Sequence, residues 1–148
     1  MRLGVSSFTF PWAVGGIDLD RPIFMGASEL LDKAKSLGAE VLQIGDNLPL
    51  DKLSVDALDQ LKVDADAFGI SLEVGTRGIS SANIKTYLEI AVRLGSPILR
   101  VVIDTKDHEP DLDEIIQLLL PFSKNFKSLG IKLAIENHDR LKCSEFNE

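Results

Sequence analysis

Short apolar runs alternate with longer amphipathic segments along this chain of 148 residues, and that alternation predicts βαβ units built around a parallel sheet. A helical segment closes on Leu-Gly or Phe-Gly at four places, and a strand-like run follows each of them within a few residues. Glycine supplies the left-handed backbone conformation that ends a helix, so each pair marks a helix C-terminus. The four pairs are Leu37-Gly38, Phe68-Gly69, Leu94-Gly95 and Leu129-Gly130.

The pattern predicts five strands with four helices between them. The helix before the fifth strand is the best defined, because its apolar residues recur at spacings of three and four and so share one face. Pro121 is expected to kink this helix. The strands are expected at 2–8, 41–46, 71–76, 98–104 and 132–138, and the apolar face of the last helix at Leu112, Ile115, Ile116, Leu119, Phe122, Phe126 and Leu129.

Polar and apolar residues sort by parity along the predicted strands, because successive side chains point to opposite faces of a sheet. One face is apolar and suited to pack under helices. Unpaired charges are costly to bury, so the polar face requires a wet or mutually paired interior. Barrel enzymes place their chemistry in such an interior, near the C-terminal ends of parallel strands. The polar face consists of Gln43, Glu73, Arg100, Asp104, Glu136 and His138.

Two α/β architectures compete for this pattern. A flavodoxin-like sheet of five strands fits the length better, because a full (β/α)₈ barrel needs about 250 residues. Against it, no strand-to-helix turn carries a phosphate-binding glycine motif, and Gly75-Thr76-Arg77-Gly78 has the wrong spacing for one. We therefore predict a single α/β domain over 1–148, a partial (β/α)₈ TIM barrel of about four and a half βα units with parallel strands, truncated after strand five.

Charge and cysteine content narrow the functional classes. A net charge of −7 with no cluster of Lys and Arg argues against a nucleic-acid partner and favours a small substrate. The single cysteine, Cys143, excludes an internal disulfide and suits a reducing compartment. The sequence contains neither a signal-peptide pattern nor an apolar stretch of about 18 residues, so we expect a cytoplasmic protein that does not enter a membrane.

The segment Leu133-Ala134-Ile135-Glu136-Asn137-His138-Asp139-Arg140 resembles the xylose isomerase-like superfamily of sugar and sugar phosphate isomerases and epimerases. Segments 41–47 and 72–76 are similar to its second and third strands. The resemblance implies the N-terminal half of a TIM-barrel enzyme that moves a proton next to the carbonyl of a sugar, sugar phosphate or polyol. It also implies a divalent metal, Mn²⁺, Mg²⁺ or Zn²⁺, in the full-length parent.

Glu136 is the residue that the resemblance marks most clearly. It is expected to be a metal ligand and, in the epimerase branch, one of two glutamates that exchange the proton. The other ligands in the family are an aspartate, a histidine and a glutamate on later strands, so we expect this chain alone to be incomplete and inactive. The plainer alternative is a strand-end carboxylate that is solvated or paired with Arg140.

Five further residues are candidates for substrate binding. His138 shares parity with Glu136 and is expected to contact the substrate, although it could equally be an ordinary loop residue. Glu73 and Arg100 either form a structural pair inside the barrel, which we favour, or bind sugar hydroxyls. Phe8 and Trp12 follow the first strand, where the family resemblance suggests a hydrophobic wall for the sugar; local packing is the alternative.

Two other functions remain open. An endonuclease IV-like phosphodiesterase shares the barrel and the strand-five glutamate, but it draws histidine ligands for several zinc ions from early strands, and strands two to four contain no histidine here. A non-catalytic half-barrel is the second alternative, because the edges of the first and fifth strands would recruit partners. A homodimer formed through these edges is the simplest such assembly.

Overall fold

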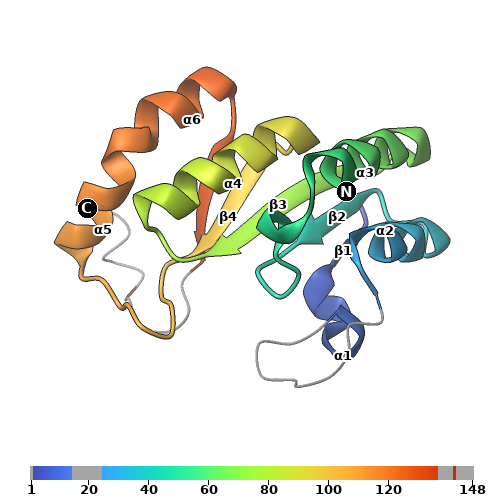
Figure 1. Ribbon diagram of the computed structural model, residues 1–148, viewed down its shortest axis with the longest axis horizontal. Helices are drawn as coiled ribbons and strands as arrows, with labels where there is room; N and C mark the ends of the chain where they lie inside the picture. The colour runs from blue at the N-terminus through green and yellow to red at the C-terminus, as the bar shows by residue number, and fades with distance from the viewer. Residues whose placement is uncertain (1, 15–24, 137–141, 143–148) are drawn as a thin grey trace.

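The computed structural model describes residues 2–14, 25–136 and 142 and contains one parallel sheet in which neighbours in sequence are neighbours in space. The five predicted strands are confirmed, although the first is shorter than expected because its second half forms a 3₁₀ turn. Figure 1 shows the strands running side by side from blue to red. They are β1 (Gly4–Ser6), β2 (Val41–Ile44), β3 (Ser71–Arg77), β4 (Ile98–Val102) and β5 (Lys132–Glu136).

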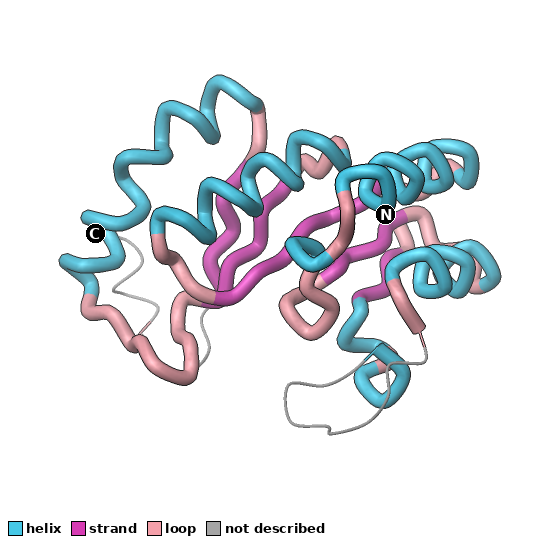
Figure 2. The backbone as a smooth tube through the Cα atoms, viewed as in Figure 1, coloured by secondary structure: helices cyan, strands magenta, loops and turns pink. Residues whose placement is uncertain are grey.

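The strand order decides between the two predicted architectures. A flavodoxin-like sheet has the order 2-1-3-4-5 and carries helices on both faces. Here the order is β1-β2-β3-β4-β5, and right-handed crossovers between successive neighbours place every connecting helix on the same side of the sheet. The helices α2 to α6 cover one side of the strands in Figures 1 and 2. The sheet is therefore part of a (β/α)₈ barrel wall, as predicted.

The helices end where the glycine pairs predict. Gly69, Gly95 and Gly130 adopt left-handed conformations with φ of 68°, 65° and 68° directly after α3, α4 and α6. Gly38 has the same conformation one residue after the C-cap of α2. The helical elements are η1 (Ser7–Thr9), α1 (Pro11–Val14), α2 (Ala27–Ser36), η2 (Leu50–Lys52), α3 (Val55–Phe68), α4 (Ser81–Leu94), α5 (Leu112–Leu119), η3 (Leu120–Phe122) and α6 (Ser123–Leu129).

Pro121 divides the last helical segment instead of only bending it. It lies in the 3₁₀ turn η3 between α5 and α6, because proline has no N–H group and its ring clashes with the preceding turn of an α-helix. The prediction of one continuous apolar face was also wrong in part. Ile116 is 52% exposed and Leu129 is 47% exposed, since these helices cover β5, the last strand of the described sheet, and lack a further layer to pack against.

The hydrophobic core lies between the sheet and the helices. The predicted apolar face is confirmed on β2, β3 and β4, whose outward side chains are at most 4% exposed, whereas Leu133 and Ile135 on β5 are only partly buried. The core side chains of these strands are Leu42, Ile44, Leu72, Val74, Leu99 and Val101, and Ile103 follows directly after β4.

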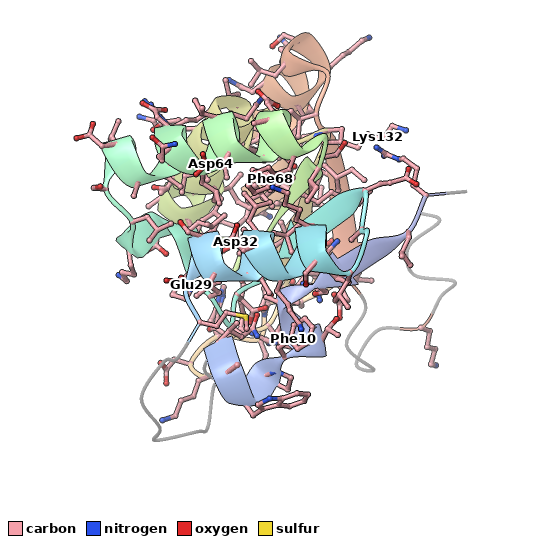
Figure 3. All side chains as sticks on the ribbon, turned by 90° about the vertical axis from the view of Figure 1, so that its right-hand side faces the viewer. Phe10, Glu29, Asp32, Asp64, Phe68 and Lys132 are labelled. Carbon is pink, nitrogen blue, oxygen red and sulfur yellow. The ribbon has the colours of Figure 1, made fainter. Side chains whose placement is uncertain are left out.

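The helical layer also packs sideways. The ammonium group of Lys35 on α2 lies 3.6 Å from the ring centroid of Phe68 on α3, and Figure 3 shows Phe68 where these two helices meet. The same view places Phe10 and Lys132 at opposite ends of the molecule, which correspond to the C-terminal and N-terminal ends of the strands. None of the helices in the described part of the chain combines the length and apolar character that crossing a membrane requires.

Candidate functional site

The face of the sheet opposite the helices carries the polar strand residues. Strand register places Gln43 beside Glu73, Gly75 beside Arg100, and Val102 beside Glu136. Because side chains alternate along each strand, the polar members of these pairs share the inner face of the barrel wall. Of the six residues predicted for this face, Gln43, Glu73, Arg100 and Glu136 lie on it. Asp104 follows the end of β4, and His138 lies outside the described residues. The structure decides which of the four contact one another.

Glu136 forms an ion pair with Arg100 on the neighbouring strand. The two side chains are 33% and 17% exposed, so the pair is partly shielded from water. The favoured pairing of Glu73 with Arg100 was wrong, because Glu73 instead accepts a hydrogen bond of 3.0 Å from Nε2 of Gln43. The alternative partner of Glu136, Arg140, lies outside the described residues.

Two glycines form the floor beneath the Phe8 and Arg100 side chains. A Cβ atom on Gly45 would lie 2.7 Å from Cε2 of Phe8, and one on Gly75 would lie 3.1 Å from Cα of Gly45 and 3.4 Å from Nη1 of Arg100. Only glycine therefore leaves room for the ring and the guanidinium group at this depth. The Arg100 guanidinium lies 5.9 Å from the centroid of the Phe8 ring, a cation–π arrangement.

A second charged pair flanks the first. Nε of Arg77 donates to Oδ2 of Asp46 at 2.7 Å, and its Nη1 donates to the backbone carbonyl of Asp104 at 3.0 Å. The Asp46 side chain is 8% exposed. Sequence reasoning missed both Asp46 and Arg77 as site residues. The available signals were that Asp46 follows the apolar run of β2 and that Arg77 shares strand parity with Glu73.

Loop contacts fix the position of Phe8. The Ser7 hydroxyl donates to Oδ1 of Asn47 at 2.6 Å and accepts the backbone N–H of Gly45 at 2.9 Å. Ser7 is fully buried and Asn47 is 6% exposed. These bonds connect the turn after β1 to the loop after β2, so they hold the Phe8 ring over the glycine floor.

Three buried polar atoms at this end of the sheet have no hydrogen-bond partner among the described residues. They are Oδ1 of Asp46, Nδ2 of Asn47 and Nη1 of Arg100. Burial lowers the pKa of Arg100, and the nearby positive charge of Arg77 lowers it further, whereas the carboxylate of Asp46 opposes both effects. The Arg100 guanidinium is therefore desolvated and incompletely paired.

The remaining predicted site residues fall into two groups. Trp12 on α1 is 59% exposed and makes an edge-to-face contact with Phe10 at 6.2 Å between ring centroids. His138 lies outside the described residues.

Within the described part of the chain, no group of three or more acidic, histidine or cysteine side chains is arranged to hold a metal ion. Glu136 offers one carboxylate, so these residues do not form a metal site by themselves.

Sequence comparison finds a related enzyme but no matching family model. The chain is 30% identical over 145 residues to the 3-oxo-isoapionate decarboxylase of Pectobacterium atrosepticum. The match covers 98% of this chain and 52% of the relative, so the chain spans about half the length of the curated relative it matches.

Solved structures share the fold at low sequence identity. A xylose isomerase domain-containing protein from Salmonella typhimurium aligns with a TM-score of 0.62 at 12% identity, covering 90% of this chain and 48% of the other. A xylose isomerase domain protein from Planctomyces limnophilus aligns with a TM-score of 0.58 at 16% identity, covering 92% of this chain and 52% of the other. The IolI protein, solved with a bound zinc atom, aligns with a TM-score of 0.57 at 18% identity, covering 91% of this chain and 51% of the other. The predicted fold is confirmed: the chain has the fold of part of a TIM barrel like those of the xylose isomerase domain proteins.

Proposed function

We propose that this chain provides one side of the active site of a sugar-processing enzyme that forms an enediolate from a sugar-derived carbonyl compound. The observation that carries this proposal is the ion pair between Arg100 and Glu136 at the C-terminal ends of neighbouring strands, the end at which TIM-barrel enzymes place their chemistry. The likeness to xylose isomerase domain proteins and to a decarboxylase of a sugar-derived acid supports the same class.

Glu136 is the proposed proton-transfer residue. A carboxylate can take the proton from the carbon next to a carbonyl and return it to the neighbouring carbon or to the opposite face, which gives isomerisation or epimerisation. The Arg100 guanidinium fixes the orientation of the Glu136 carboxylate. The charged partner on the next strand thus positions the base for the reaction.

A divalent metal is part of the proposal. When bound, such an ion would act as a Lewis acid that stabilises the oxygen of the enediolate. Glu136 is the described residue that we expect to bind it, and further ligands have to come from outside the described residues. The zinc atom in the related IolI structure supports a metal in this fold, although nothing in the described residues selects one metal.

Decarboxylation is the second candidate, favoured by the activity of the relative from Pectobacterium atrosepticum. When a 3-oxo acid loses CO₂, the bond between the carboxylate carbon and its neighbour breaks and its electron pair forms an enolate. A general acid then protonates the enolate carbon. Isomerisation and decarboxylation therefore require the same stabilised oxygen anion and differ in what leaves the substrate.

Calorimetric titration of Mn²⁺ and Mg²⁺ into the chain and into Glu136→Gln tests the proposal. We expect saturable binding that this variant loses and that Glu114→Gln retains, because Glu114 pairs with His108 on the exposed side of the α5 N-terminus. Since Glu136 alone does not form a metal site, such binding requires that residues outside the described part, or a second copy of the chain, supply the other ligands. The absence of binding, or equal binding by all three proteins, would contradict a metal site completed at Glu136 in this chain. Released CO₂ and solvent deuterium incorporation, followed with a 3-oxo sugar acid and a ketose, then distinguish the two reactions.

A further inference from the structure

The unpaired atoms at the C-terminal ends of β2 and β4 form a complementary set. Asp46 presents an acceptor, Oδ1, and Arg100 presents a donor, Nη1, and neither has a hydrogen-bond partner among the described residues. Buried polar groups are normally satisfied, so unpaired ones require an explanation such as an absent water or ligand. The Asp46 side chain is 8% exposed, and its carboxylate raises the pKa of Arg100, so the two charges interact.

The charges around these atoms select the kind of group that would join them. Asp46 already pairs with Arg77, and Arg100 already pairs with Glu136, so positive and negative charges balance within the two pairs. An anionic group would face two carboxylates, and a cation would face two guanidinium groups. A neutral hydroxyl fits better, because it donates one hydrogen bond and accepts others at the same oxygen.

We propose that Asp46 and Arg100 form a subsite for one hydroxyl of a polyhydroxylated substrate, which donates to Oδ1 of Asp46 and accepts from Nη1 of Arg100. This inference rests on the proposed function, because it takes the substrate to enter at the C-terminal ends of the strands. It deepens that proposal by assigning a substrate-binding role to Asp46, which was not among the residues predicted from the sequence.

Phe8 borders this subsite in the described conformation. Both polar atoms are shielded from solvent, and the Phe8 ring lies over Gly45 within cation–π distance of Arg100. The ring belongs to the short 3₁₀ turn η1 and is 40% exposed. In this proposal, a ring displaced toward solvent would uncover the floor formed by Gly45 and Gly75 and give the hydroxyl access to the two atoms.

Nuclear magnetic resonance titration with xylitol tests the subsite, with 1,5-pentanediol as a probe that lacks the secondary hydroxyls. We expect xylitol to shift the amide signals of Gly45 and Gly75 and the ring signals of Phe8 in a saturable way, and pentanediol to leave them in place. Asp46→Asn replaces the acceptor by a donor, so it should weaken xylitol binding at least about tenfold. Asp51→Asn, a carboxylate change on the same loop that faces Tyr87, should match the wild type.

Each contrary outcome is informative. The absence of saturable shifts with xylitol, equal shifts with pentanediol, or wild-type affinity in Asp46→Asn would overturn the subsite. Thermal melting shows whether Asp46→Asn folds; if it does not, Arg100→Lys, which keeps the charge but loses the second nitrogen donor, carries the same expectation. Loss of the subsite with intact metal binding at Glu136 would leave the proposed function standing, whereas loss of metal binding alone would leave the subsite.

Discussion

Arg100 reaches along the barrel wall to pair with Glu136, although Glu136 lies two residues further along the register. Arg100 is opposite Ala134, whereas Glu136 is opposite Val102. The guanidinium group is therefore carried toward the C-terminal ends of the strands, where it meets the carboxylate. A shorter side chain at this position would leave Glu136 without its charged partner.

The pair should contribute measurably to stability. Glu136→Gln removes a partly buried negative charge and leaves Arg100 with a weaker partner, so the free energy of unfolding should fall by about 1–2 kcal/mol. Urea denaturation measures this change. Glu114→Gln, which removes an exposed pair with His108, should change stability by no more than about 0.5 kcal/mol. Equal effects of the two substitutions would show that shielding does not strengthen the Arg100 pair.

Gly75 should not tolerate alanine. The added methyl group would lie 3.1 Å from Cα of Gly45 and 3.3 Å from the Ile44 carbonyl oxygen, and backbone atoms on the neighbouring strand cannot move aside cheaply. We expect Gly75→Ala to destabilise the fold by about 1–3 kcal/mol and to shift the Arg100 guanidinium signals.

Gly38→Ala is the control for backbone strain at a glycine. It introduces a left-handed alanine with φ of 68° and no neighbouring atom within 4 Å, so it should destabilise the chain without moving the Arg100 signals. A stable Gly75→Ala variant with unchanged Arg100 signals would contradict the proposed role of the glycine floor.

Asn83 should position Arg77. Its Nδ2 donates to Oγ1 of Thr76, to the carbonyl of Arg77 and to the carbonyl of Gly78, at 3.1, 3.1 and 2.8 Å. Asn83→Ala removes these bonds, so we expect a loss of about 1–2 kcal/mol and faster amide hydrogen exchange at Gly78. Unchanged exchange would indicate that β3 holds this turn without the asparagine.

Tyr87 should make stability depend on alkaline pH. Burial raises the pKa of Tyr87 to about 12, and its hydrogen bond to Asp51 adds to this effect. The ordinary tyrosine pKa of 10.0 describes the unfolded chain. Between these values the unfolded chain loses the proton while the folded chain retains it, so stability is full below pH 10 and falls by about 1.4 kcal/mol per pH unit until about 12.

Absorbance titration can measure this pKa directly, because Tyr87 is the single tyrosine of the chain. The folded protein should show a midpoint near 12, and the denatured chain one near 10.0. Tyr87→Phe should remove this component of the alkaline dependence. A folded-state midpoint near 10.0 would contradict the burial and hydrogen bonding of the hydroxyl.

Local pattern was sufficient for the five strands and for the ends of the helices between them, whereas the spatial order of the strands came from the structure. The glycine pairs located the ends of the helices because positive φ is a property of a single residue. Alternation within each strand separated the core face from the polar face, because side-chain direction follows from the strand alone. The apolar pattern did not predict which side chains of a helix are buried: Ile116 belongs to the apolar stripe yet is 52% exposed.

The sequence by itself determined a parallel α/β wall with an apolar outer face and a polar inner face that ends at Glu136. Only the tertiary structure decided that Glu136 pairs with Arg100, that Glu73 pairs with Gln43, and that Asp46 joins the site. Pairing depends on the register between strands and on how far each side chain reaches across them. No single strand encodes these distances, because they arise only when the strands are assembled.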